Sequence, residues 1–294
     1  MSAHVEHTEE FFLEVADGTS LFVRDWSAKS NNAPGILIMH GLGEHSGRYI
    51  HIARFFLGLG FRVRSFDQRG HGQSSGRRGV VPDDEAILRD TRLVINDFLK
   101  QLPDAPMIFA HSMGGLFATH FVLQGLAPVK AFILSSPAFS VKTSTFQKIL
   151  FKFSRALIPY LGVAHGTNGR YLSHDSEVVA AYQNDPLVHS RISASLFGSM
   201  LSSMSYVKAH IQELPIPLLL LVADADVVVN PRGAKALVQQ IENSEHAKFL
   251  SAIFYPGFYH EIFNELEALR AFDDVRTWLE QKNLMPETPA ISAT

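Results

Sequence analysis

The chain has 294 residues, of which 46% are hydrophobic and 19% are charged, and its formal net charge is −3. This balance is typical of one large globular α/β domain with an insertion, and less so of two independent domains. A slightly acidic chain without a long basic run has no bulk attraction for nucleic acid, so we expect no nucleic-acid partner. The lack of cysteine excludes disulfides, thiolate catalysis and cysteine-ligated zinc, and the histidines form no recognisable metal-binding motif, so we expect no metal.

The sequence has no pattern typical of a targeting or membrane-spanning segment. Met1–Glu10 is acidic and lacks the basic start and apolar core of a secretory signal. The longest apolar run, Ile216–Ala223, is far shorter than the ~20 residues needed to span a bilayer. We therefore predict a cytoplasmic protein whose contact with membranes is at most peripheral.

A predicted β-hairpin comes first and is followed by an alternation of strands and helices. The half-apolar segments Phe11–Val15 and Leu21–Trp26 flank the turn signal Asp17-Gly18. Short apolar runs of the kind buried in parallel sheets follow, mostly separated by segments of helical period. The runs are Gly35–Met39, Phe61–Phe66, Pro106–Ala110, Val129–Ser135, Pro217–Ala223 and Lys248–Tyr255, and the helical segments include Tyr49–Leu59, Asp84–Gln101 and Pro231–Ile241. Together they predict a doubly wound, mostly parallel sheet of eight strands.

One connection is too long for a simple crossover. About 80 residues separate Ser135 from Pro217, which indicates an insertion. The tail after Lys282 contains Pro286 and Pro289 and few apolar residues, a composition typical of disorder. The predicted division is a core of 1–136 and 207–282, an inserted cap or lid of 137–206, and a disordered tail of 283–294.

The insertion contains a predicted helix with two unlike faces. The apolar face holds Phe146, Ile149, Leu150, Phe153 and Leu157, and the opposite face holds Lys148, Lys152 and Arg155. This helix either packs its apolar face on the core or exposes that face to a lipid surface. Both interpretations are compatible with a lid. We expect Phe146, Leu150 and Phe153 to contact the substrate.

The segment Ala110–Gly115 joins an apolar strand to an apolar helical segment with no loop between them. A serine on such a sharp turn, the nucleophile elbow, needs small residues two positions before and after it. Ala110 and Gly114 meet this need around Ser112. A literal G-x-S-x-G occurs instead around Ser74, but the glycines and Pro82 that follow it forbid an immediate helix. We predict Ser112 as a catalytic nucleophile.

A serine nucleophile needs a histidine base oriented by a carboxylate, and in this kind of sheet both follow the serine along the chain. His260 comes directly after the last predicted strand, at the carboxyl edge where catalytic groups gather. His246 precedes the same strand and so lies at the opposite edge. Asp226 and Asp224 both follow the strand Pro217–Ala223, and position alone leaves either as the acid.

The oxyanion of an acyl-transfer intermediate needs two amide donors. The N–H of Met113, at the start of the predicted helix, supplies one of them. The second comes from the glycine-rich loop His40–Gly43, which follows the strand Gly35–Met39, and we predict the N–H of Leu42.

These residues resemble the serine hydrolases of the α/β-hydrolase superfamily, and specifically the monoacylglycerol lipase and lysophospholipase-like branch. The likeness spans about residues 9–280 and consists of blocks in the order of that branch. The blocks are His40–Tyr49, Asp67–Ser74, His111–Gly115, Asn184–Leu187, and Ala225-Asp226 through Tyr259-His260. The family's strand-end G-x-x-D maps onto Ala223–Asp226, which implies Asp226 as the acid.

The resemblance implies an α/β-hydrolase fold with a helical lid. It also implies that the protein hydrolyses monoacylglycerol through an acyl-enzyme, with a lipid ester as its partner and no cofactor. Phe263 stands where the family has a second histidine. We therefore expect Glu44 or Arg48 to bind the glycerol, unless these two side chains simply pair with each other at the surface. The alternatives are a lysophospholipase, a broad carboxylesterase or thioesterase, and, outside enzymes, a ligand-binding receptor on a hydrolase fold.

Overall fold

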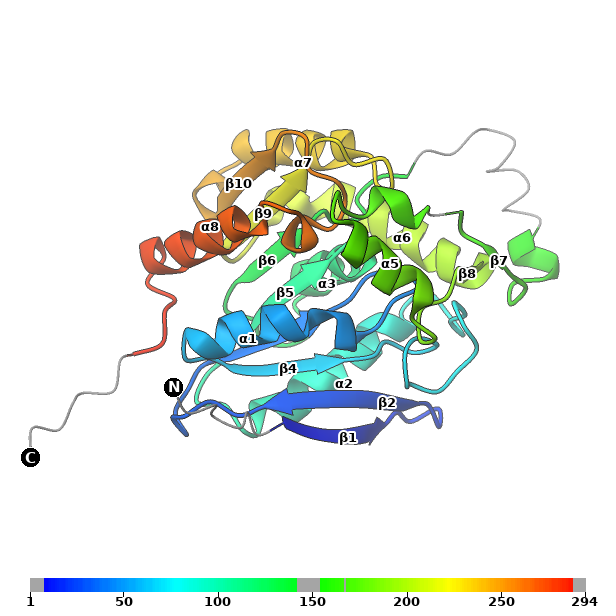
Figure 1. Cartoon of the computed structure of the whole chain (residues 1–294), viewed down its shortest axis with the longest axis horizontal. Coiled ribbons are helices and arrows are strands. Elements are labelled where there is room, and N and C mark those ends of the chain that lie inside the picture. The colour runs from blue at the N-terminus through cyan, green and yellow to red at the C-terminus, as the bar shows by residue number, and fades with distance from the viewer. Residues whose placement is uncertain (1–7, 142–153, 167, 288–294) are drawn as a thin grey trace, which may run out of the picture.

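One large, mostly parallel sheet forms the centre of the molecule (Figure 1). The computed structural model describes residues 8–141, 154–166 and 168–287. The strands run in the spatial order β1-β2-β4-β3-β5-β6-β9-β10; β1/β2 and β2/β4 are antiparallel and the other neighbours are parallel. Their bounds are β1 Thr8–Glu14, β2 Ser20–Trp26, β3 Gly35–Met39, β4 Arg62–Phe66, β5 Met107–His111, β6 Phe132–Ser135, β9 Leu218–Ala223 and β10 Leu250–Tyr255. The predicted eight-stranded sheet is confirmed.

The central strands are buried on both of their faces. Every residue of β3, β5 and β9 is buried. Successive side chains of β5 point to opposite faces of the sheet, so that Ile108 and Ala110 join one hydrophobic cluster and Met107 and Phe109 join the other. A strand that is buried on both faces needs apolar side chains at successive positions. The continuous apolar runs in the sequence therefore predicted these strands correctly.

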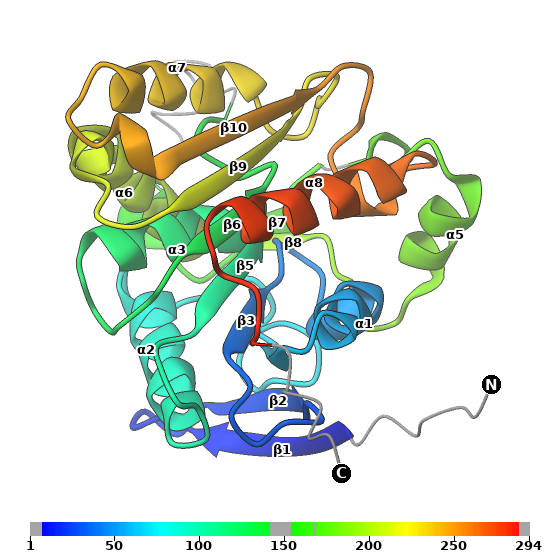
Figure 2. The same ribbon diagram turned by 90° about the vertical axis from the view of Figure 1, so that its left-hand side faces the viewer.

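Helices cover the two faces of the sheet (Figure 2). On one face lie α1 (Ile50–Gly58) and α8 (Ala268–Gln281), and on the other lie α2 (Ala86–Leu99), α3 (Met113–Leu123), α6 (Ala194–His210) and α7 (Pro231–Glu242). The start of α7 shows how local sequence sets a helix boundary. Asn230 accepts a hydrogen bond from the N–H of Arg232, and Pro231 takes the first helical position. This start fixes the loop just before it, which carries Asp226.

The segment between β6 and β9 contributes a cap at the carboxyl ends of the central strands (Figure 1). Its described elements include the antiparallel pair of short strands β7 (Gly162–Ala164) and β8 (Arg191–Ser193), helix α5 (Ser176–Asn184), which lies between them in the chain, and α6. Helix α6 buries Leu196, Met200 and Val207 in the same cluster as α3. It therefore crosses the predicted boundary between residues 206 and 207, and the division into core and cap stays a prediction.

Most of the predicted lid helix lies outside the described residues, and this includes Phe146, Leu150 and Phe153. Arg155, from its predicted basic face, is described, and its Nη2 forms an ion pair with Oδ1 of Asp84 at 2.6 Å. Within residues 8–141, 154–166 and 168–287, no helix has both the length and the apolar character needed to cross a bilayer.

The carboxyl-terminal segment is described as far as Glu287. The N–H of Leu284 donates to the carbonyl of Leu279 at 2.9 Å, at the end of α8. Leu284 and Met285 also pack, partly buried, against the cluster beneath α1 and α8. These contacts extend the packed part of the chain a few residues into the predicted tail, 283–294, whose disorder stays a prediction.

Candidate active site

Ser112 lies on the sharp turn between β5 and α3. Its φ of 51° and ψ of −117° form a strained backbone conformation for a residue other than glycine. The turn is held by hydrogen bonds from the N–H of Ser112 to the carbonyl of Ser135 at 3.0 Å and from the N–H of Leu116 to the carbonyl of Ser112 at 3.1 Å. A Cβ at Gly114 would stand 2.5 Å from the carbonyl oxygen of His40. The glycine therefore allows α3 to begin directly against the end of β3.

The side chains of Ser112, His260 and Asp226 form one hydrogen-bonded line. Ser112 Oγ lies 2.9 Å from His260 Nε2, and His260 Nδ1 lies 2.6 Å from Asp226 Oδ2. An ionised carboxylate only accepts, so the imidazole carries its proton on Nδ1 and leaves Nε2 free to accept the serine proton. Asp226 Oδ1 accepts from the N–H groups of Val228 at 2.8 Å and Val229 at 2.9 Å, which orient the carboxylate. The structure brings together the three residues predicted as nucleophile, base and acid.

The surroundings of this line shift both titratable groups. Burial raises the pKa of Asp226, but the His260 imidazole and two backbone N–H groups outweigh burial and hold that pKa below 3.8. Burial lowers the pKa of His260, but Asp226, and after it Glu261 and Glu44, raise that pKa above 6.5. Both shifts stabilise a carboxylate beside an imidazolium, which is the pair that forms once the serine has given up its proton.

The alternative acid and the alternative serine have partners of their own. Asp224 forms an ion pair with Lys235, with Oδ1 and Nζ 2.7 Å apart. Ser74 Oγ accepts from the N–H of Phe22 at 2.8 Å and donates to the carbonyl of Asp67 at 2.5 Å. These contacts tie Ser74 to strand β2 and Asp224 to helix α7. The geometry therefore favours Asp226 as the acid and Ser112 as the nucleophile.

A cavity of about 470 Å³ lies over Ser112. Leu42 and Met113, whose amides we predict to bind the oxyanion, both line it. The loop of Leu42 passes close to the nucleophile, because a Cβ on Gly41 would stand 3.1 Å from the Cβ of Ser112. Much of the remaining wall is apolar and consists of Ala138, Val141, Leu172, Ile192, Phe197, Met200, Val227, Val228 and Val229.

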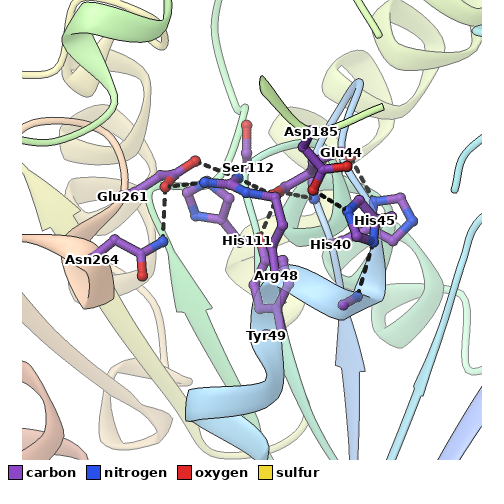
Figure 3. Close-up of polar contacts among 12 residues, drawn as sticks. His40, Glu44, His45, Arg48, Tyr49, His111, Ser112, Asp185, Glu261 and Asn264 are labelled. Atoms are coloured by element: carbon purple, nitrogen blue, oxygen red, sulfur yellow. Dashed lines mark hydrogen bonds and ion pairs between the residues drawn. The ribbon is translucent and has the colours of Figure 1, made fainter. Parts of the chain in front are cut away.

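Part of the cavity wall is polar and charged (Figure 3). Glu44, which the sequence suggested as a substrate-binding residue, lines it together with His111 and Glu261. Arg48 is not among the described residues of this lining. Its Nη1 lies 2.5 Å from Glu44 Oε2 and 2.7 Å from Glu261 Oε1, and its Nη2 lies 2.8 Å from Glu261 Oε2. Glu44 and Arg48 therefore pair with each other, as the alternative considered from the sequence had it, but in a buried cluster and not at the surface. Glu261 is a third member of the cluster.

Glu44 also orients the loop that carries the predicted oxyanion donor. Its Oε1 accepts from the N–H of Gly41 at 2.7 Å and from the hydroxyl of Tyr49 at 2.6 Å. Burial raises the pKa of Glu44, but Arg48 and the neighbouring histidines outweigh it and lower that pKa to about 2. Burial lowers the pKa of His111 to about 4. At neutral pH the carboxylate is therefore charged and the His111 ring beside it is not.

Phe263 packs in the hydrophobic core. Its ring centroid lies 5.1 Å from that of Phe109 and 5.0 Å from that of Phe272. All three rings belong to or pack against the cluster beneath α1 and α8. The carboxylate of Glu261, two positions earlier, is the polar group that the segment after His260 presents to the cavity.

The histidines near the site do not form a metal centre. The ring centroids of His40 and His71 are 5.3 Å apart, and those of His71 and His189 are 4.7 Å apart. Burial lowers the pKa of all three rings, so they are neutral at pH 7. In the part of the chain that the structure describes, no group of three or more such side chains is placed to hold a metal ion.

Sequence reasoning did not identify the contacts between distant segments. His45 Nε2 lies 2.8 Å from Asp185 Oδ2, although the two residues are 140 positions apart. The N–H of His189 donates to the carbonyl of Gly43 at 2.8 Å. Glu261 is 213 positions from its partner Arg48. The only local signal for Glu261 was an acidic residue directly after the proposed base.

Comparison with known proteins identifies relatives of this chain. The family model described as serine aminopeptidase, S33, matches residues 31–267. Human monoglyceride lipase is 30% identical over 279 residues, which cover 91% of this chain and 89% of that protein. An uncharacterized abhydrolase domain-containing protein of Dictyostelium discoideum is 30% identical over 283 residues, or 95% of this chain, and this match spans only 30% of its own length.

A solved structure is similar in both sequence and fold. In the crystal structure of Paleococcus ferrophilus monoacylglycerol lipase, the sequence is 30% identical to this chain. The two structures superpose with a TM-score of 0.79, over 89% of this chain and 98% of the lipase chain. The expectation of an α/β-hydrolase fold is confirmed. The chain belongs to the α/β-hydrolase family of serine hydrolases, in its monoacylglycerol lipase branch.

Proposed function

We propose that this protein hydrolyses monoacylglycerol to a free fatty acid and glycerol. The observation that carries the proposal is the hydrogen-bonded line of Ser112, His260 and Asp226 beside a largely apolar cavity with a polar end. The apolar wall suits a fatty acyl chain, and the polar end suits a small alcohol. Relatives named monoglyceride lipase or monoacylglycerol lipase support the same substrate class.

In the acylation step His260 Nε2 takes the proton of the Ser112 hydroxyl, and the serine oxygen attacks the ester carbonyl. The N–H groups of Leu42 and Met113 stabilise the oxyanion, and the loss of one such donor typically costs ~3–4 kcal/mol. Asp226 stabilises the imidazolium and keeps the ring in the correct tautomer. His260 then gives the proton to the departing glycerol oxygen, which leaves an acyl group on the serine.

In the deacylation step water takes the place of the alcohol. His260 removes a proton from the water, and the resulting hydroxide attacks the acyl carbonyl in the same oxyanion site. Collapse of the intermediate releases the fatty acid and returns the proton to Ser112. Glu44 contacts the alcohol at the polar end, and Arg48 acts indirectly by positioning the Glu44 carboxylate.

We also propose that the cap contacts membranes at their surface, where a monoacylglycerol resides. Leu157, Ile158, Leu161 and Val163 are exposed by 77%, 49%, 55% and 57%, and such a group of apolar side chains favours an interface with lipid. Replacement of Leu157 and Leu161 by glutamate should weaken binding to phosphatidylcholine vesicles. It should also slow hydrolysis of vesicle-borne monoacylglycerol and leave hydrolysis of a dissolved short-chain ester intact. Unchanged vesicle binding would contradict this part of the proposal.

The test of the catalytic assignment compares two serine variants. Ser112→Ala should abolish both monoacylglycerol turnover and labelling by a fluorophosphonate. Ser74→Ala removes the serine of the literal G-x-S-x-G and should retain both. If labelling survives in the first variant and disappears in the second, the assignment is wrong. A panel of monoacylglycerols, lysophospholipids and p-nitrophenyl esters then distinguishes a lipase from a lysophospholipase or a broad esterase.

A further inference from the structure

The polar end of the cavity holds more negative charge than its guanidinium can neutralise. Glu44 and Glu261 both line this end, and Arg48 lies between them (Figure 3). One guanidinium balances one of the two carboxylates and leaves one negative charge over. Among the described residues that line the cavity there is no lysine or arginine. His111 adds no positive charge at neutral pH, because burial lowers its pKa to about 4.

Arg48 is shielded from anything that enters the cavity. Its two terminal nitrogens are engaged by the two carboxylates, with three contacts of 2.5 to 2.8 Å. Its guanidinium carbon lies 4.8 Å from the ring centroid of Tyr182, which belongs to the cap. Only 11% of its side chain is exposed. A ligand in the cavity therefore meets the carboxylates directly and the cation only through them.

Both carboxylates keep room for a hydrogen-bond donor. Glu44 accepts three hydrogen bonds, from the Gly41 amide, from a tyrosine hydroxyl and from Arg48. Glu261 also accepts three, two from Arg48 and one from Nδ2 of Asn264. A carboxylate offers about four acceptor sites, so roughly one site on each remains for a donor of the ligand. A hydroxyl group can use such a site, whereas a carboxylate or a fully ionised phosphate has no proton to donate.

From these contacts we propose that Glu261 is a specificity-determining residue. With Glu44 it makes the alcohol end of the cavity select esters of uncharged or cationic alcohols and reject esters whose alcohol carries a phosphate or a carboxylate. An anion brought beside these two buried carboxylates meets an uncompensated negative charge at low effective dielectric. The inference rests on the proposed function, since it requires the leaving alcohol to occupy this end.

Glu261 is the member of the cluster whose charge can be tested separately. Glu44 also holds the amide of Gly41, next to the proposed oxyanion donor, so its loss would disturb the reaction of every substrate. The side chain of Glu261 contacts only Arg48 and Asn264 in the described hydrogen-bond network. Its backbone N–H donates to the carbonyl of Leu172, a contact that a side-chain substitution leaves in place.

The experiment measures kcat/KM for three octanoyl esters below their micelle-forming concentrations: those of glycerol, of glycerol phosphate and of choline. In the wild-type protein the phosphate-bearing ester should react at least ~tenfold more slowly than the glycerol ester, because juxtaposed like charges are costly. Glu261→Gln should bring the kcat/KM values for the glycerol ester and the phosphate-bearing ester closer together. It should also lower the kcat/KM for the choline ester relative to that for the glycerol ester. Hydrolysis of p-nitrophenyl octanoate reports changes that are common to all substrates.

Glu261→Asp is the matched control, because it keeps the charge and should keep the wild-type order of substrates. Ratios within one variant cancel any loss of active protein, so a poorly folding variant still gives an answer. Equal kcat/KM for the glycerol and phosphate-bearing esters in the wild type would overturn the inference alone. Failure to hydrolyse the glycerol ester, by a protein that still cleaves p-nitrophenyl octanoate, would overturn the proposed function and this inference with it.

Discussion

The two sides of the active-site cavity are built in different ways. On the sheet side, ten of the eleven residues of α3 are buried. On the cap side, none of the nine residues of α5 is buried. Burial of a large apolar side chain contributes ~1.5–3 kcal/mol, so α3 is held by many such contributions and α5 is not. The comparison indicates that the reacting groups stand on a part of the fold that is difficult to displace, whereas α5 on the opposite side can move more easily.

A few polar contacts connect the cap to the loops that carry the chemistry. Asp185 accepts from His45, close to the loop of the proposed oxyanion donor, at 2.8 Å. Glu265, in the loop after the proposed base, lies 2.9 Å from Nδ1 of His174 in the cap. Removal of one partner of a buried hydrogen bond costs ~1–3 kcal/mol. We therefore expect changes on the sheet side to impair every substrate and changes in the cap to impair long-chain substrates selectively.

The largest effect on the sheet side is expected for Asp226→Asn. An amide in this place favours the wrong imidazole tautomer, and in a well-studied serine protease such a change lowers kcat about 10⁴-fold. We expect a loss of the same order for long and short p-nitrophenyl esters alike. Asp224→Asn, which breaks only the ion pair with Lys235, should change kcat by less than about threefold. If Asp224→Asn lowers kcat more than Asp226→Asn does, Asp224 is the acid and our assignment is wrong.

A methyl group at Gly114 should also impair every substrate. The Cβ of Gly114→Ala would stand 2.5 Å from the carbonyl oxygen of His40 and 2.7 Å from that of Met39, so the end of β3 and the loop after it must shift. Displacement of one oxyanion donor lowers kcat by about 10²–10³-fold. Gly58→Ala is the control, because a Cβ there meets no atom within 4 Å and alanine favours the helix. Wild-type kcat in the Gly114 variant would show that the elbow tolerates the extra volume.

The sheet side of the site was predictable from sequence because its signals are local. An apolar strand followed at once by small residues predicted the turn of Ser112, and the order of strand ends predicted the place of His260. The same order placed the acid at Asp224 or Asp226, and only the family resemblance implied Asp226. The cap side depends on pairs such as His45 with Asp185, which are 140 positions apart. Such pairs have no periodicity or spacing of their own. Only the fold brings them together, and for the same reason the partnership of Glu261 with Arg48 was missed.

A smaller and more selective effect is expected in the cap. Asp185→Asn replaces an acceptor of the His45 ring by a group that can also donate, so the contact between cap and core weakens. We expect about a tenfold loss of kcat/KM for long-chain monoacylglycerol and little change for p-nitrophenyl acetate. Hydrogen exchange should become faster in α5 and remain slow in β5. Glu177→Gln removes the same charge from an exposed position of α5 and is the control. Equal losses for both esters would contradict the proposed division between the two sides.

The smallest expected change is a shift of the pH profile. His260 must be neutral to accept the serine proton, so kcat/KM should fall as the pH drops through its pKa, which Asp226, Glu261 and Glu44 raise above 6.5 against the opposing effect of burial. Glu261→Gln removes one of these negative charges. The pKa of His260 should fall, and the acidic fall of kcat/KM should move to lower pH.

The sign of this shift separates an electrostatic role of Glu261 from a purely structural one. The neutral ring of His111 also faces His260, at a centroid distance of 4.6 Å, but it carries no charge that could reverse the shift at neutral pH. Glu267→Gln, at an exposed position in the same segment, should leave the profile in place because solvent screens it. Measurement with a p-nitrophenyl ester between pH 5 and 8 covers the range in which histidine titrates. A profile that stays fixed or moves to higher pH in the Glu261 variant would show that the charge of this residue does not reach the base.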